Sequence, residues 1–329
     1  MNIYGTLGPA CCNVQTLERM LRAGMTGARL NLSHCSIDEA APMIAALHEA
    51  AGNVGVRAEL LIDMQGPELR IGSLETPMEL AAGECFTLGA GAVPVPEAVL
   101  PHLLPGQELL LDDGKILARV TENRGDRAEA TVLRGGVLRG RKSICLCGVY
   151  IETPVLTGMD LENIKKAAHY GVTWLMQPFV RRREELEAVR SALDEKGAES
   201  IRIMAKIESV EGVENIGQII PACDEICIAR GDLGNALGLC ELPAAQKRLA
   251  AQCRAAGRDF TVVTQMLHSM EKSPIPTRAE MSDIFNAVLD GAASLMLTGE
   301  TAVGAYPVEA VEYLVSCARA AEEYINKLR

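Results

Sequence analysis

The run IRIMAKIE, residues 201–208, is mostly apolar and ends in two charges, Lys206 and Glu208. A short apolar run of this kind predicts a strand that is buried on both faces of a parallel sheet. Side chains two residues apart on a strand point to the same face. The sequence therefore places a cation and an anion side by side at the end of a buried strand, and the rest of the chain has to explain them.

Similar runs alternate with helical patterns along the chain. The expected strands are residues 2–7, 27–33, 58–64, 173–180, 201–208, 225–231, 259–266 and 294–299. The expected helices lie near residues 14–22, 37–51, 160–170, 183–196, 211–219, 242–256, 278–290 and 307–325. Eight strands, each followed by a helix, predict the α/β class and a (β/α)8 TIM barrel, whose functional residues gather at the C-terminal ends of the strands.

One interval interrupts this alternation. Between Ile71 and Cys147 there are ten glycines, five prolines and short strand-like runs such as QELLLDDGKILARVTE (107–122), but no helix of ordinary length. This composition predicts a small all-β domain inserted after the third strand. The expected domains are a barrel of residues 1–70 and 148–329 and a β-rich lid of residues 71–147. A decorative insertion is the alternative to a lid.

Composition limits the partners. The net charge of −11 argues against general affinity for nucleic acid or for an anionic membrane. The N-terminal residues lack the charged and apolar regions of a signal peptide, and no run reaches the roughly 18 apolar residues of a membrane span. A cytoplasmic protein is expected. The eleven cysteines include no C-x-x-C pair, so reduced and mostly buried thiols are expected, with zinc or disulfides as alternatives.

Polar residues alternate with apolar ones in GARLNLSH, residues 27–34. On a strand, Arg29, Asn31 and Ser33 would all point to one face. A cation, an amide and a hydroxyl at a strand end suit a phosphate together with a hard cation. Hydrogen-bonded polar groups of the core are the alternative.

Two carboxylates lie at the ends of adjacent expected strands. Glu208 ends the fifth strand, and Asp232 follows the sixth in the glycine-flanked turn of IARGDLG, residues 228–234. Mg²⁺ or Mn²⁺ takes a few such oxygen ligands and completes its shell with water and substrate. An internal ion pair between Lys206 and Glu208 is the alternative, but it does not account for Asp232.

More polar residues are expected at the same rim. Asp63 ends the third strand, and Arg70 follows a Gly-Pro turn at the root of the lid, where a phosphate role is favoured over a surface charge. Thr264 offers a hydroxyl at the end of the seventh strand. The chain has no glycine-rich phosphate loop, zinc-protease motif or serine-hydrolase motif, so side chains and metal are expected to bind any phosphate.

These residues belong to segments that resemble the pyruvate kinase family. The matching segments are TLGPA (6–10), AGMTGARLNLSH (23–34), GPELR (66–70), DDG (112–114), AKIES (205–209), EGVENI (211–216), ARGDLG (229–234), TQML (264–267), PTRAEMSD (276–283) and MLTGETAVGAYPVEAV (296–311). They cover nearly the whole chain in the family's order. The resemblance implies a barrel with a β-rich lid and a transfer of the phosphoryl group of phosphoenolpyruvate to ADP, giving pyruvate and ATP.

The resemblance also implies roles for individual residues. Lys206 would neutralise the transferring phosphoryl group and the enolate oxygen, Arg29 would grip the phosphate, and Thr264 would lie by the substrate carboxylate and the proton-donating water. The further positions that it implies are Gly231 and Asp232 for substrate, Glu208 and Asp232 for Mg²⁺ or Mn²⁺, Asn31, Ser33, Asp63 and the backbone of Met64 for K⁺, and His34, Arg70, Asp113 and Lys142 for the nucleotide. The acidic Glu68 in GPELR favours K⁺ dependence in this family.

The sequence departs from the family pattern at several places. Gln65 replaces a lysine, which removes a cation near the nucleotide phosphates. The lid returns through KSICLC (142–147) in place of K-G-V-N-L-P, and the fourth strand ends in QPFVR (177–181) in place of A-S-F-V-R. Because the chain ends at Arg329, before the family's allosteric C-terminal domain, a non-allosteric protein is expected. Arg278, in a helix used for barrel contacts in the family, leaves a homodimer possible.

Two other functions remain open. The altered positions are compatible with a metal-dependent kinase or lyase that acts on another oxoacid or nucleotide, which a substrate panel would reveal. A non-catalytic relative that binds phosphoenolpyruvate or nucleotide would be stabilised by ligand without turnover. The retained lysine, carboxylates and threonine favour the phosphotransferase over both.

Overall fold

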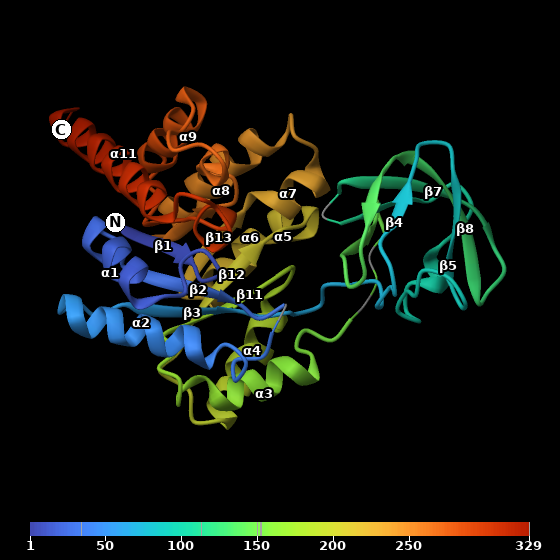
Figure 1. The fold of residues 1–329 in the computed structure, drawn as a ribbon, viewed down its shortest axis with the longest axis horizontal. Helices are drawn as coiled ribbons and strands as arrows, with labels where there is room; N and C mark the ends of the chain where they lie inside the picture. The colour runs from blue at the N-terminus through green and yellow to red at the C-terminus, as the bar shows by residue number, and fades with distance from the viewer. Residues whose placement is uncertain (34, 113, 150, 152, 329) are drawn as a thin grey trace. The chain divides into compact units, whose positions relative to one another are not determined.

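The computed structural model describes residues 1–33, 35–112, 114–149, 151 and 153–328 (Figure 1). The chain divides into two compact units, one formed by Met1–Gly66 with Val155–Arg329 and the other by Pro67–Pro154. Each unit has a hydrophobic core of its own. The domain boundaries expected at residues 70/71 and 147/148 remain predictions.

The first unit is built on a closed barrel of parallel strands, as expected for the (β/α)8 class. In the order of their pairing around the barrel, the strands are β1 (Asn2–Thr6), β2 (Gly27–Asn31), β3 (Glu59–Asp63), β11 (Trp174–Gln177), β12 (Arg202–Ile207), β13 (Glu225–Ala229), β14 (Phe260–Val263) and β15 (Ser294–Met296). Pairing of β15 with β1 closes the barrel. Each strand lies within its expected range, so the predicted fold class is confirmed.

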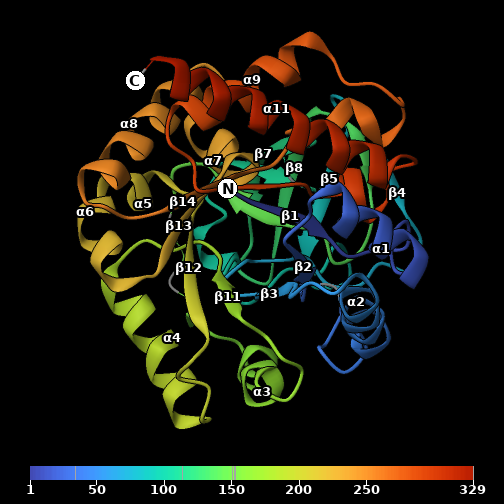
Figure 2. The same ribbon diagram turned by 90° about the vertical axis from the view of Figure 1, so that its left-hand side faces the viewer.

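Helices surround these strands (Figure 2). They are α1 (Val14–Ala23), α2 (Ala41–Val54), α3 (Gly158–Ala167), α4 (Arg183–Glu195), α5 (Val210–Glu214), α6 (Ile216–Ile219), α7 (Arg230–Leu237), α8 (Leu242–Ala255), α9 (Arg278–Leu289), α10 (Gly299–Ala302) and α11 (Pro307–Leu328), with 3-10 turns η2 (Ile220–Ala222) and η3 (His268–Glu271). Helix α1 begins where Asn13 accepts a hydrogen bond from the Thr16 amide, and α3 and α9 begin with capping boxes at Thr157 and Thr277.

Two local predictions are wrong. The single helix expected over residues 211–219 is divided at Asn215 into α5 and α6. Asp232 lies in the first turn of α7 instead of in a turn between glycines. Gly231 and Gly234 do not prevent this helix, and a carboxylate in a first turn is favoured by the helix dipole.

Apolar side chains fill the barrel interior. They are Tyr4, Leu61, Trp174, Met176, Met204, Cys227, Ala229, Val263 and Met296, which come from seven of the eight strands. A barrel packed in this way is a core and not a channel. Ligands must therefore bind at the ends of the barrel. The polar residues at the C-terminal end of the strands are the candidates for binding them.

The second unit is all β, which confirms the predicted insertion after the third barrel strand. Its strands are β4 (Met78–Leu80), β5 (Cys85–Gly89), β6 (Glu108–Leu111), β7 (Ile116–Asn123), β8 (Arg127–Arg134), β9 (Gly136–Leu138) and β10 (Ile144–Leu146), with the short η1 (Leu100–His102). Five of them form an antiparallel sheet in the order β10-β6-β7-β8-β5, and β4 pairs with β9. Alternate residues of β7 are buried, which gives this unit its core. Its role as a lid remains a prediction.

All eleven cysteines are free of disulfide bonds in the structure. The expectation that most of them are buried is wrong, because Cys12, Cys85, Cys145, Cys147 and Cys240 are exposed. None of the helices in the described part of the chain is long and apolar enough to cross a membrane.

Candidate active site

Four charged side chains meet at the C-terminal ends of β2, β3 and β12. Arg29 donates from Nε and Nη2 to Oδ2 of Asp63, at 2.8 and 2.6 Å. Lys206 Nζ lies 3.2 Å from both carboxylate oxygens of Asp63 and 3.1 Å from Oε1 of Glu208. The two carboxylates are 3% exposed and the two cations 13% exposed. The structure thus brings together four of the residues predicted from the sequence.

Burial and charge act in opposite directions on this network. Burial disfavours the charged form of Asp63, but Lys206 and Arg29 more than compensate, and the pKa of Asp63 is lowered. Burial likewise acts against the Lys206 ammonium, but Asp63 and Glu208 outweigh it and raise the pKa of Lys206. Lys206 therefore remains protonated at neutral pH. It can neutralise an anion, and it is not suited to accept a proton as a general base.

Lys206 and Glu208 form the ion pair that the sequence offered as an alternative to a functional role. Lys206 also pairs with Asp63, so Glu208 is not its only partner. The other oxygen of Glu208 accepts a hydrogen bond of 2.8 Å from the Phe179 amide. Phe179 lies just after β11 and has a left-handed backbone with φ of 51°. Such a conformation is costly for a bulky residue, and it holds the amide toward Glu208.

Asp232 is partly exposed at the start of α7, directly after β13. Within the described ranges, no three His, Cys, Asp or Glu side chains are grouped closely enough to hold a metal ion by themselves. Two carboxylates from adjacent strands are a suitable partial donor set for Mg²⁺ or Mn²⁺, since these ions keep water and substrate oxygens in their shell. The residues present therefore fit a divalent ion that is completed by its substrate.

Thr264 and Gln265 follow β14 in left-handed backbone conformations, with φ of 80° and 55°. For the β-branched Thr264 this is an outlier. A methyl group added at Gly231 would lie 3.2 Å from Cγ2 and 3.7 Å from Oγ1 of Thr264. The predicted substrate residues Thr264 and Gly231 are therefore neighbours, held by backbone that L-residues rarely adopt.

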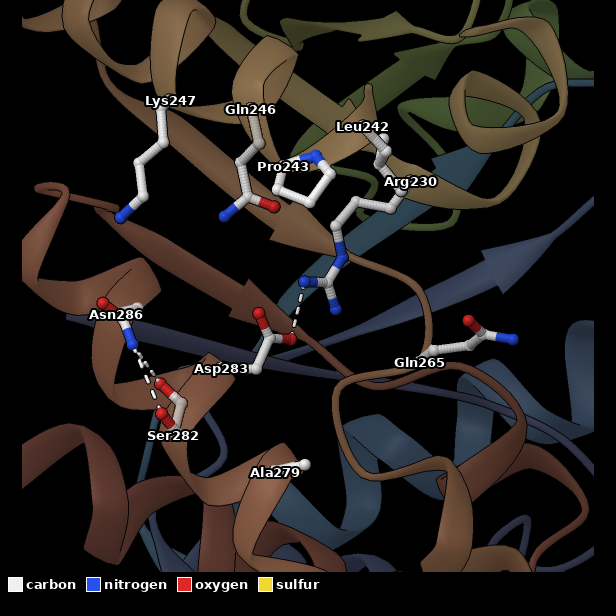
Figure 3. A pocket seen from close by; sticks show the side chains of 10 residues that line it. All are labelled: Arg230, Leu242, Pro243, Gln246, Lys247, Gln265, Ala279, Ser282, Asp283 and Asn286. Carbon is white, nitrogen blue, oxygen red and sulfur yellow. Dashed lines mark hydrogen bonds and ion pairs between the residues drawn. The ribbon is translucent and has the colours of Figure 1, made fainter. Parts of the chain in front are cut away.

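Arg230 holds this strained segment, a role that was not predicted from the sequence. Its guanidinium donates from Nε and Nη2 to the carbonyl oxygen of Thr264, at 3.1 and 2.7 Å, and pairs through Nη1 with Asp283 at 2.6 Å. Figure 3 shows Arg230 reaching from the start of α7 toward Asp283 on α9, at a cavity of about 480 Å³ that Gln265 also lines. In the sequence, the position of Arg230 directly before the predicted substrate residue Gly231 could have indicated this role.

The oxygen atoms predicted for K⁺ lie around the ends of β2 and β3. β2 ends at Asn31, so Ser33 lies in the turn beyond it and not on the strand. Asn31 Oδ1 accepts a 3.1 Å hydrogen bond from the Ser33 amide, and the Met64 amide donates to Met176 at 3.1 Å. An amide, a hydroxyl, a carboxylate and a backbone carbonyl are all hard oxygen donors, which fits a cation such as K⁺.

The predicted nucleotide residues are in different positions along the chain. His34 and Asp113 lie outside the described residues. In the β-rich unit, Arg70 pairs with Glu68 at 2.6 Å and donates to the Arg141 carbonyl, and Lys142 Nζ lies 2.8 Å from Asp112. Both cations therefore have carboxylate partners close to them in the sequence or in the same unit.

Comparison with known proteins gives one consistent result. Residues 1–311 match the family model described as pyruvate kinase, barrel domain. The chain is 38% identical to the pyruvate kinase of Bacillus licheniformis and 39% identical to that of Geobacillus stearothermophilus, over 98% of this chain and 57% of each relative. It is 39% identical to the pyruvate kinase of Aeropyrum pernix, over 95% of this chain and 69% of that protein. The chain thus spans 57% of the length of the first two relatives.

Proposed function

This chain belongs to the pyruvate kinase family, and from that premise we propose that it transfers the phosphoryl group of phosphoenolpyruvate to ADP, giving pyruvate and ATP. The observation that carries this proposal is the position of Lys206 between Asp63 and Glu208. A protonated lysine at the mouth of a parallel barrel, with Arg29 beside it, is suited to a substrate that carries both phosphate and carboxylate charge.

The proposed roles follow from charge and position. Arg29 grips the phosphate, and Lys206 neutralises the phosphoryl group during transfer and the enolate oxygen that remains. Thr264 lies by the substrate carboxylate and the water that protonates the enolate, with Gly231 and Asp232 lining the same place. Phosphoryl transfer of this kind depends on positioning and charge stabilisation more than on covalent help from the protein.

Metal ions are part of the proposal. Glu208 and Asp232 would hold Mg²⁺ or Mn²⁺, and such an ion supplies positive charge to the phosphate oxygens. Asn31, Ser33, Asp63 and the Met64 carbonyl would hold K⁺. Support comes from the chemistry of the donors, which are all hard oxygens.

The proposal extends to the nucleotide, to a second copy of the chain and to the location of the protein. His34, Arg70, Asp113 and Lys142 are the residues proposed for ADP and ATP. A homodimer through the barrel helices would involve α9, which carries Arg278. Free cysteines are typical of the reducing cytoplasm, where a role in glycolysis would place the protein.

A coupled assay for pyruvate tests the proposed reaction. Purified wild-type protein with phosphoenolpyruvate, ADP, Mg²⁺ and K⁺ is expected to form pyruvate, and the rate should fall when Mg²⁺ is chelated or when Na⁺ replaces K⁺. Folded protein that forms no pyruvate would contradict the proposal. Thermal stabilisation by phosphoenolpyruvate without turnover would then favour a non-catalytic binding protein, and turnover of another oxoacid in a substrate panel would favour a related enzyme.

A further inference from the structure

One buried carboxylate contacts both chain segments that connect the barrel unit to the β-rich unit. Asp160 Oδ1 accepts from the Gln65 amide at 3.0 Å, and Oδ2 accepts from the Gly66 amide at 3.0 Å. Oδ2 also accepts from the amide and the hydroxyl of Thr157, both at 2.8 Å. Asp160 is fully buried, with 0% exposure. Its carboxylate therefore has four donors, two from each side of the insertion.

The positions of these donors along the chain give the contact its meaning. The barrel unit is interrupted after Gly66 and resumes at Val155. Gln65 and Gly66 are the last residues before the interruption, and Thr157 is the third residue after it. Asp160 is 95 residues from Gln65 in sequence, and the β-rich unit lies between them. The contact therefore forms only when the chain has folded so that the two connections lie next to each other.

The end of β11 makes a second set of contacts with the same connections. Gln177 Nε2 donates to the carbonyl of Val155 at 3.0 Å. Gly66 has φ of 58°, and a methyl group added there would lie 2.4 Å from Cγ of Pro178. Gln177 and Pro178 are two of the residues at which the sequence departs from the family pattern. The connections are therefore packed against Gln177 and Pro178 as well as bonded to Asp160.

Helix capping alone does not explain the contacts of Asp160. A capping box needs only the bonds between the cap residue and the third helical residue, here Thr157 and Asp160. The amides of Gln65 and Gly66 belong to no helix. Glu280 in α9 provides an internal comparison, because it forms a capping box with Thr277 and also accepts from the Ser269 amide. In the part of the chain that the structure describes, its carboxylate has no hydrogen bond to either connection.

We propose that Asp160 is a positioning residue that fixes both connections of the β-rich unit to the barrel. Because Gln65 directly follows Asp63 and Met64, the same bonds fix the end of β3, where Asp63 holds Arg29 and Lys206. Removing the carboxylate frees the two connections from each other and loosens the end of β3. The effect on turnover rests on the proposed function, whereas the effect on the connections does not.

Hydrogen exchange tests the structural part directly. In D160A, the amides of Gln65 and Gly66 are expected to exchange at least about tenfold faster than in wild type, because local opening no longer breaks two bonds to a carboxylate. T157V keeps the carboxylate and should accelerate exchange only at the start of α3. E280A, the matched control, should leave residues 65–66 unchanged. Unchanged exchange at residues 65–66 in D160A, or equal acceleration throughout the barrel, would overturn the proposal.

Kinetics separate positioning from loss of stability. D160A is expected to raise KM for ADP about tenfold and to lower kcat, as for hinge residues. The loosened end of β3 should raise KM for phosphoenolpyruvate less, by about threefold. D160N retains one acceptor oxygen and should be intermediate, and it serves if D160A does not fold. Equal changes in both KM values, or a similar ADP effect in E280A, would contradict a positioning role. If wild type forms no pyruvate, the proposed function fails while the exchange experiment still decides the role of Asp160.

Discussion

The two ends of the barrel carry similar charged groups in different surroundings. At the C-terminal end, Lys206 lies between Asp63 and Glu208. At the N-terminal end, Arg202 pairs with Glu59, stacks on the ring of Trp174 at 3.8 Å, and lies by a cavity of about 730 Å³. Ion pairs alone therefore do not distinguish the proposed active site from the opposite end.

The carboxylates differ in the direction of their pKa shifts. Two cations lower the pKa of Asp63 at the C-terminal end in spite of its burial. At the N-terminal end, burial raises the pKa of Glu225, although hydroxyl groups of Thr261 and Ser294 partly offset it. The C-terminal end thus concentrates positive charge on its carboxylates, whereas the N-terminal end satisfies Glu225 with neutral donors.

Backbone strain is also distributed unequally. Phe179, Thr264 and Gln265 have left-handed backbones, and all three follow the C-terminal ends of barrel strands. Within the described residues, the N-terminal ends of the strands carry no non-glycine residue of this kind. Strain persists where surrounding structure enforces it, typically at functional sites. The comparison indicates that the C-terminal end is built for function and the N-terminal end for stability, as in other barrels of this class.

The largest expected effect is the loss of activity in K206A, for which R202A at the opposite end of the barrel is the control. K206A should lower kcat by about 10³-fold or more, because the charge that meets the phosphoryl group and the enolate is lost. R202A should keep kcat within about twofold and lower the melting temperature by a few degrees. The pyruvate assay and thermal unfolding measure the two quantities. Full activity in K206A, or an equal loss of kcat in R202A, would erase the distinction between the ends.

A smaller effect is expected from releasing the strain at Thr264. T264G removes a left-handed β-branched residue, which costs about 1–3 kcal/mol, and adds up to about 1 kcal/mol of chain entropy in the unfolded state. The variant should therefore be more stable by about 1 kcal/mol and melt at a higher temperature, while its kcat falls at least about tenfold with loss of the hydroxyl. T264S, the matched variant, should retain most activity. A lower melting temperature for T264G would contradict the prediction that the left-handed backbone at Thr264 destabilises the protein.

The sequence predicted the parts of this comparison that depend on periodicity. Eight apolar runs gave the barrel, and a spacing of two placed Lys206 and Glu208 on one face. Alternation cannot predict that the Phe179 amide turns toward Glu208, since that depends on a left-handed residue after β11. It also cannot predict the bond from Arg230 to the Thr264 carbonyl or from Gln65 to Asp160, because these join segments 34 and 95 residues apart.

At Asp232, in contrast, a local sequence pattern predicted the wrong secondary structure. Glycines on both sides of Asp232 predicted a turn, because glycine is a weak helix former. The structure has α7 there, and the helix packs Leu233 into the core while keeping Asp232 at the mouth. Tertiary packing thus overrode a local preference without moving the residue away from the rim where the sequence had placed it.

The smallest expected effect is a pH-dependent change of stability at the N-terminal end. The folded pKa of Glu225 is raised, so its contribution to stability is fully present below the unfolded pKa of about 4.3 and is lost as pH rises through the folded pKa. E225Q keeps an oxygen for Thr261 and Ser294 but cannot ionise. Its melting temperature relative to wild type should therefore rise by a few degrees between pH 4 and pH 8.

The matched control for this experiment has the opposite sign. The pKa of the half-buried Glu18 is lowered, chiefly by a hydrogen bond from Asn53, so its contribution is present above the unfolded pKa and is lost as pH falls through the folded pKa. E18Q should lose stability relative to wild type as pH rises from 4 to 8. The kcat of E225Q should equal that of wild type, because Glu225 lies at the end opposite Lys206. If E225Q changed kcat and left the pH dependence of melting unaltered, Glu225 would have to be assigned to function, and the contrast between the two ends would fail.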